Sequence, residues 1–236
     1  MRLLLLSNST SHGAGYLDHA MEAMREVLGP VRRLVFVPFA LHDQTGYTAK
    51  ARQRFAREGV EVVGATADAA GVAAVAEAEA VFVGGGNTFR LLDRLQRSGL
   101  LPALRRRALA GMPYLGASAG TNVAAPTIMT TNDMPIVQPD GFAALGLVPF
   151  QINPHYLDPD PASRHMGETR EERIREFLEE NATPVVGLRE GTWLSRDGDR
   201  LRLGGRVGAR IFRRGREPEE VEPGAALDAL LRGAEA

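Results

Sequence analysis

The sequence YLGASAGTN, residues 114–122, organises the interpretation of the whole chain. It begins with apolar residues of strand type, continues through Ser118, and ends in small residues that can start a helix. Glycines at positions 116 and 120 flank Ser118, so the backbone can bend sharply and pack closely there. Such a turn lifts a serine hydroxyl out of a sheet and leaves the amide of Ala119 at a helix N-terminus, where an oxyanion can bind. The stretch predicts a nucleophile, although a packing turn of small residues has the same pattern.

Upstream of this turn, short apolar runs alternate with amphipathic segments. Strands are expected at 3–6, 34–37, 60–63 and 80–83 and just before Ser118; helices are expected at 17–28, 49–58, 68–78, around 89–95 and at 102–110. The alternation predicts an α/β fold with a mostly parallel, flavodoxin-like sheet and helices on both faces. Ligands bind beyond the carboxyl ends of such strands, so residues 84–87 and Ser118 are expected to face one cleft.

Downstream of Asn122 the pattern is less regular. A short strand at 150–153 leads to His155, and Thr169 to Glu172 form a capping box that opens a helix. Short strands at 184–188, 193–194, 201–203 and 211–212 are expected to add an antiparallel margin to the sheet near the C-terminus. Since no repeat or linker interrupts the chain, it is interpreted as a single domain over residues 1–236.

Composition narrows the classes of function. The 236 residues carry a net charge of −1, which argues against nucleic-acid binding and against a membrane-surface partner. The chain has no cysteine and therefore no thiolate nucleophile. The apolar run at residues 3–6 is too short for a signal peptide or a membrane span. These features predict a cytoplasmic protein.

Serine catalysis needs a base, and that base needs a carboxylate. His155 is the best candidate base, because it follows a strand end and a proline; the other histidines, His12, His19, His42 and His165, are expected in loops or at the surface. Either Asp133, in a polar loop, or Glu190, after the strand at 184–188, can supply the acid, and the sequence pattern does not choose between them.

Two further features have more than one interpretation. The glycines of Gly84 to Asn87 predict either a phosphate cradle or, through Gly85 or Gly86, the second half of an oxyanion hole; the phosphate reading is weaker because the spacing of a nucleotide motif is absent. Arg170 stands in the first turn of a helix, where a cation is unfavourable, so it is expected either to bind a substrate carboxylate or to pair with a nearby acid. A metal site joining His155, Asp158 and Asp160 lacks any recurrent ligand spacing, and no metal is expected.

Several long strings together resemble the peptidase E family, the α-aspartyl dipeptidases among the serine peptidases. The resemblance spans nearly the whole chain and is carried by residues 3–10, 83–89, 118–120, 130–137, 151–155 and 167–170. It implies a fold related to class I glutamine amidotransferases, with serine in place of their cysteine.

The resemblance also implies roles for individual residues. Ser118 is the nucleophile, His155 the general base, and Asp133, ahead of Glu190, the acid. Gly85, Gly86, Asn87 and Ala119 surround the oxyanion and substrate, and Arg170 is a candidate for binding the aspartyl side chain.

The expected activity is hydrolysis of Asp-X dipeptides without a cofactor, by a monomer or homodimer. The alternatives are a related serine hydrolase of broader or different specificity (aminopeptidase, β-aspartyl peptidase or esterase) and a non-enzymatic module that binds a phosphate ligand. The chain departs from the family in two places: Ala117 replaces the usual tryptophan before the serine, and the segment between His155 and Arg170 is one residue longer. The smaller residue is expected to widen the pocket and relax its selectivity.

Overall fold

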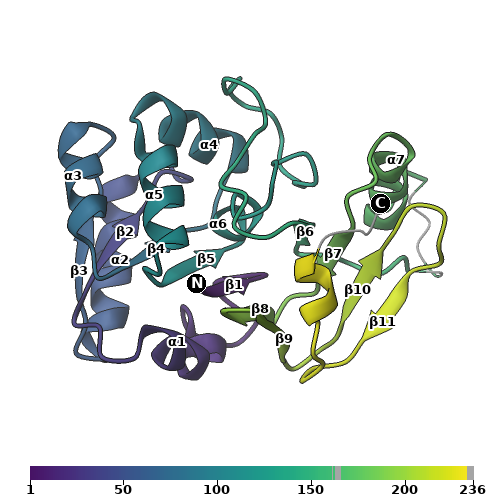
Figure 1. Cartoon of the computed structure of the whole chain (residues 1–236), viewed down its shortest axis with the longest axis horizontal. Helices are drawn as coiled ribbons and strands as arrows, with labels where there is room; N and C mark the ends of the chain where they lie inside the picture. Colours follow the sequence, from purple (N-terminus) through teal and green to yellow (C-terminus); the bar gives the residue numbers. More distant parts are fainter. Residues whose placement is uncertain (161, 163–165, 233–236) are drawn as a thin grey trace.

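The computed structural model describes residues 1–160, 162 and 166–232. The chain forms a seven-stranded sheet and a separate four-stranded sheet, which lie side by side in Figure 1. The large sheet has the order β3-β2-β4-β5-β1-β8-β9. Its strands are β1 (Arg2–Leu6), β2 (Arg33–Val37), β3 (Glu61–Gly64), β4 (Ala80–Val83), β5 (Tyr114–Ala117), β8 (Thr192–Asp197) and β9 (Arg200–Gly205).

The first five strands of the large sheet run parallel, as their continuous apolar runs predict. Helices cover both of its faces: α3 (Ala69–Glu77), α4 (Thr88–Arg97) and α5 (Leu100–Leu109) pack on one face, and α1 (Met21–Leu28) and α2 (Gln44–Ala56) on the other. Figure 1 shows α4 and α5 on the side of the sheet opposite α1. The predicted α/β class with a mostly parallel sheet is confirmed.

The expected antiparallel margin is only partly right. Strands β8 and β9 do extend the large sheet as an antiparallel pair. The small sheet, in contrast, has the order β11-β10-β7-β6 and consists of β6 (Gln151–Pro154), β7 (Val185–Leu188), β10 (Ala209–Phe212) and β11 (Glu219–Val221). One face of it joins the core of the large sheet, and α7 (Arg170–Glu180) covers the other. Short strands reveal their pairing only through distant contacts, so the sequence did not separate the two sheets.

Two helix starts also differ from expectation. Helix α2 begins at Gln44 rather than near residue 49, because the Asp43 carboxylate accepts the Gly46 amide and caps it. At the expected start of the 17–28 helix, Leu17 has a φ of 63°, and a 3₁₀ turn (η1, Asp18–Ala20) precedes α1. A second 3₁₀ turn (η2, Asp228–Arg232) lies near the C-terminus. No helix within the described residues is long and apolar enough to cross a membrane.

Strand order explains where the candidate site lies. Strand β5 pairs with β1 on one side and β4 on the other, and all three run parallel. Their carboxyl ends therefore meet at one edge of the sheet, which brings Ser7 after β1, the glycines after β4, and Ser118 after β5 together.

Candidate active site

Ser118 occupies a sharp turn between β5 and the short helix α6 (Ala119–Asn122). Its backbone has φ 52° and ψ −111°, a strained conformation for a residue with a side chain. The neighbouring glycines make the turn possible, since a Cβ on Gly120 would lie 2.1 Å from the Val83 carbonyl oxygen and one on Gly116 2.5 Å from the Gly120 oxygen. The Ser118 amide donates to the Leu6 carbonyl at 3.0 Å, so the turn is fixed to the adjacent strand β1.

His155 follows β6 and also has a positive φ, of 55°. Its amide donates to the hydroxyl of the buried Ser7 at 2.9 Å, and that hydroxyl donates to the Leu188 carbonyl at 2.8 Å. The preceding carbonyl, of Pro154, accepts the side-chain amide of Asn132 at 2.7 Å. The backbone at the base of the imidazole is thus held by Ser7, which follows β1, and by Asn132 of the polar loop, and Ser7 is itself bonded to Leu188 of the small sheet.

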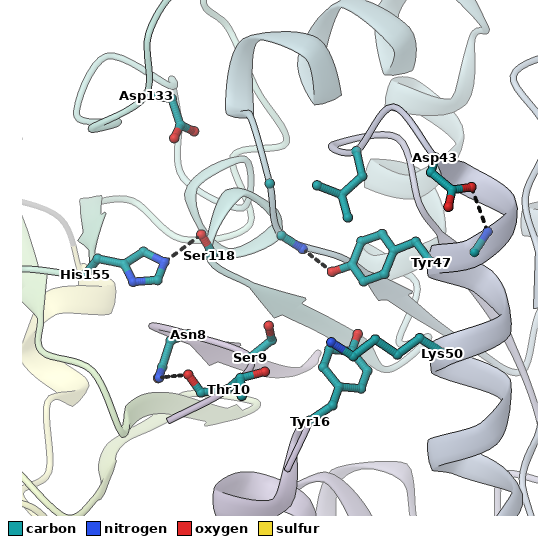
Figure 2. Close-up of a pocket in the computed structure, with 14 residues that line it drawn as sticks. Asn8, Ser9, Thr10, Tyr16, Asp43, Tyr47, Lys50, Ser118, Asp133 and His155 are labelled. Carbon is teal, nitrogen blue, oxygen red and sulfur yellow. Dashed lines mark hydrogen bonds between the residues drawn. The ribbon is translucent and has the colours of Figure 1, made fainter. Parts of the chain in front are cut away.

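The imidazole of His155 bridges the serine and one carboxylate. Its Nε2 lies 2.8 Å from the Ser118 hydroxyl oxygen, a contact drawn in Figure 2, and its Nδ1 lies 2.6 Å from an oxygen of Glu190. With a proton on Nδ1 donated to Glu190, Nε2 is free to accept the serine proton. This is the arrangement that activates a serine and then stabilises the imidazolium it forms.

The segment that carries Glu190 is attached on both sides. The next residue, Gly191, donates its amide to the Asn8 side chain at 2.8 Å. The preceding Arg189 binds both oxygens of Asp158, each at 2.7 Å, and both oxygens of Glu220, at 2.9 and 3.0 Å. These carboxylates raise the pKa of Arg189, and Arg189 in turn lowers the pKa of Asp158. The residues before and after Glu190 in the chain are therefore both held by hydrogen bonds to side chains.

The preference for Asp133 as the partner of His155 is wrong. One oxygen of the Asp133 carboxylate accepts the Thr88 amide at 2.7 Å and the Thr88 hydroxyl at 2.6 Å, at the start of α4. Asp133 lines the same cavity as Ser118, but Figure 2 shows its carboxylate above Ser118 and apart from the imidazole of His155. The carboxylate thus pairs with one of the free amides at the N-terminus of α4, where a negative charge is favourable.

In the glycine-rich turn after β4, which is predicted to supply an oxyanion amide, Gly86 rather than Gly85 has the amide that is free among the described residues. The Gly85 amide is already donated to the Tyr47 hydroxyl at 2.9 Å. The Gly86 amide makes no hydrogen bond to any described residue, and Ala119, as the first residue of α6, precedes the first intrahelical bond. The side chain of Asn87 caps α4 by accepting the Arg90 amide and donates to the Met134 carbonyl.

A cavity of about 650 Å³ opens beside Ser118 and His155, well within the usual size of a small-ligand site. Figure 2 shows Asn8, Ser9 and Thr10 lining its floor, with Tyr16 and Lys50 at the end away from His155. These residues were missed as site residues. The polar run after the first strand was the signal for the first three, whereas nothing in the spacing of Tyr16 and Lys50 joins them to Ser118.

Arg170 is the first residue of α7 and is half-buried. Burial lowers the pKa of its guanidinium, as does the nearby Arg173, and the charges of Glu190 and Asp133 oppose that shift. Among the described residues Arg170 forms no ion pair, so the predicted pairing with an adjacent acid is not seen there. Part of the segment before it (161 and 163–165, including the predicted loop residue His165) lies outside the described residues.

Two other expectations at the site are corrected. Ala117 is fully buried in the core on the α1 and α2 side and does not line the cavity, so its small side chain does not widen the pocket directly. His19 is half-buried rather than at the surface, and burial lowers its pKa, followed by the charge of Arg206. His12 and His42 are exposed, as expected. Within the described part of the chain, no group of acidic or histidine side chains is arranged to hold a metal.

Comparisons with known proteins agree on one family. The model of Peptidase family S51 matches residues 3–204. A protein named "Peptidase E" from Streptomyces coelicolor is 59% identical over 98% of this chain and 95% of its own length. One named "Probable alpha-aspartyl dipeptidase" from Drosophila melanogaster is 48% identical over 98% of this chain and 97% of its own. The crystal structure of a peptidase from an acI-B1 actinobacterium superposes with a TM-score of 0.74 over 96% of both chains at 17% identity, which shows a shared fold.

Proposed function

The chain belongs to peptidase family S51, and we propose that it is a serine dipeptidase that hydrolyses dipeptides with N-terminal aspartate. The observation that carries the proposal is the continuous line of contacts from Ser118 through His155 to Glu190, beside a cavity of suitable size. The names of the relatives support the choice of aspartyl dipeptides.

In the proposed reaction, His155 Nε2 takes the proton of Ser118 as the serine oxygen attacks the carbonyl carbon of the aspartyl residue. Glu190 keeps the proton on Nδ1 and stabilises the imidazolium. The amides of Gly86 and Ala119 bind the oxyanion; loss of one such donor typically costs about 100- to 1000-fold in rate.

The tetrahedral intermediate collapses when His155 gives its proton to the nitrogen of the leaving residue. Water, deprotonated by the same imidazole, then releases aspartate from the ester on Ser118. The guanidinium of Arg170 lies within the field of Glu190 and Asp133 and is the cation we assign to the aspartyl side chain. No cofactor takes part in this scheme.

The test is release of the second residue from Asp-Leu, beside Glu-Leu, Ala-Leu and β-Asp-Leu, by the wild type and Ser118→Ala. We expect turnover of Asp-Leu alone, lowered at least about 10,000-fold by the substitution, with folding unchanged. Broad cleavage lost in Ser118→Ala would keep the serine mechanism and reject aspartate selectivity. Cleavage that survives Ser118→Ala would reject the mechanism.

We also propose the cytoplasm as the location, since a chain without cysteine suits a reducing compartment. Cell fractionation with an antibody to the chain would test this. The monomer or homodimer stays a prediction, to be tested by light scattering.

A further inference from the structure

Lys50 is the one lysine among 28 basic residues of the chain, all the others being arginine. It lies on α2 and lines the same cavity as Ser118 and His155. Among the described residues it has neither an ion-pair partner nor a hydrogen bond. Its ammonium lies 4.5 Å from the centre of the Tyr16 ring, which holds the side chain in place by a cation–π contact without neutralising its charge.

The surroundings of Lys50 are suited to a ligand with one negative charge. Tyr16 is 8% exposed, and its hydroxyl is buried without a hydrogen bond to any described residue, so Tyr16 contributes the ring on which the Lys50 ammonium lies. The hydroxyl-bearing residues Ser9 and Thr10 line the cavity between this end and Ser118 (Figure 2). Among the described residues no arginine lines the cavity, whereas Asp43 and Asp133 do. A phosphate would find too few cations here, but a carboxylate could bind the ammonium.

The position of Lys50 relative to Ser118 indicates which carboxylate of a dipeptide would reach the ammonium. Arg170, assigned to the aspartyl side chain, lies within the field of Glu190 and Asp133. Figure 2 shows Asp133 and His155 on one side of Ser118, and Lys50 with Tyr16 on the other. With the acyl carbon at Ser118 and the aspartyl side chain on the side of Asp133 and His155, the leaving residue extends through the cavity toward Lys50, and its free α-carboxylate is its only negative charge if its side chain is neutral.

Resting on the function proposed above, we propose that Lys50, held against the Tyr16 ring, forms a subsite for the α-carboxylate of the residue released from the dipeptide. The site would then select substrate length: a tripeptide places a neutral amide where a dipeptide places a carboxylate. Lys50 is a binding residue in this scheme and takes no part in bond making.

The kinetic test compares Asp-Leu with Asp-Leu amide, which has the same shape without the terminal charge. The wild type is expected to favour Asp-Leu, and Lys50→Met to reduce that preference about 10- to 100-fold, mainly through a higher KM for Asp-Leu. Lys50→Arg should restore part of the preference. Arg57→Met removes a cation from the exposed residue that follows α2, outside the cavity, and should leave the preference unchanged.

Three results would overturn the subsite. Equal losses on both peptides would make Lys50 structural, and no loss would make it irrelevant. A lost preference for Asp-Leu over Asn-Leu, with the amide comparison intact, would assign Lys50 to the aspartyl side chain instead.

A binding measurement separates this inference from the proposed function. Because the chain has one lysine, protein labelled with ¹³C-lysine gives one ε-methylene NMR signal, from Lys50. In Ser118→Ala, addition of Asp-Leu should shift that signal, and Asp-Leu amide should shift it much less. If the wild type hydrolyses neither peptide, the proposed function fails, but this difference still supports a carboxylate site at Lys50. Equal shifts, or none, would overturn the subsite whatever the outcome of the kinetics.

Discussion

The hydroxyl oxygen of Ser118 lies 2.8 Å from Nε2 of His155, yet the two residues follow strands of different sheets and are held in place by different kinds of contact. On the large sheet, Ser118 is held by the main chain: glycines allow close contact, and its amide bonds to the neighbouring strand. On the small sheet, His155 and Glu190 are held by side chains, among them Ser7 and the Arg189–Asp158 ion pair. The nucleophile therefore depends on local backbone geometry, and the base depends on contacts between distant segments.

The largest effect expected from a residue other than the nucleophile tests which acid belongs to the base. Glu190→Gln removes the charge that orients and stabilises the imidazolium, and we expect kcat for Asp-Leu to fall about 100- to 10,000-fold. Half of the Glu190 side chain is exposed, at 51%, so water can partly replace it and the lower end of the range is favoured. Steady-state kinetics on the purified variant gives this value.

Asp133→Asn is the matched control for that experiment. It weakens the cap on α4, so we expect a loss of about 1 kcal/mol in the free energy of unfolding and less than about a tenfold change in kcat. A larger loss of kcat in Asp133→Asn than in Glu190→Gln would reverse the assignment of the acid.

Ser118 is held by its own local backbone and His155 by distant side chains, and this difference explains which parts of the site the sequence could predict. The turn at Ser118 is encoded within a few residues by glycines and an apolar run, so its conformation and its place at a strand end were predictable. The parallel order of the first strands followed from alternation. The partner of His155 was not predictable, because Asp133 and Glu190 both lie in polar segments and their choice depends on Thr88 and on strand β7. The separate small sheet and the cavity end at Lys50 likewise depend on contacts between distant residues.

A smaller effect is expected from Ser7→Ala, which removes the hydroxyl that joins the two sheets. The His155 amide and the Leu188 carbonyl would both lose their partner in a buried place, at a cost of about 1–3 kcal/mol of folding free energy. The imidazole would lose its fixed position, and we expect kcat to fall about tenfold. Thermal denaturation and steady-state kinetics measure the two effects.

Ser98→Ala provides the matched comparison, because its hydroxyl also donates to a backbone carbonyl, that of Arg94 at 2.6 Å, but far from the base. It should lower stability without changing kcat. Equal effects of the two substitutions on kcat would mean that Ser7 does not position His155.

The smallest expected effect concerns Asp158, which pairs with Arg189 beside Glu190. Asp158→Asn should lower the free energy of unfolding at pH 7 by at most about 1 kcal/mol, because the carboxylate is half-exposed. Arg189 lowers the pKa of Asp158 in the folded state, so the stabilisation is present above the unfolded pKa of about 3.9 and is lost as pH falls through the folded value. The stabilities of wild type and variant should therefore differ at pH 7 and converge below about pH 4. Denaturant titrations across this range measure the difference, and Asp160→Asn, in the same segment, controls for loss of a charge. If the difference in the free energy of unfolding between wild type and Asp158→Asn did not change with pH, the Arg189–Asp158 ion pair would not stabilise the segment that holds Glu190. Ser7 would then be the one side-chain contact that distinguishes the support of His155 from that of Ser118.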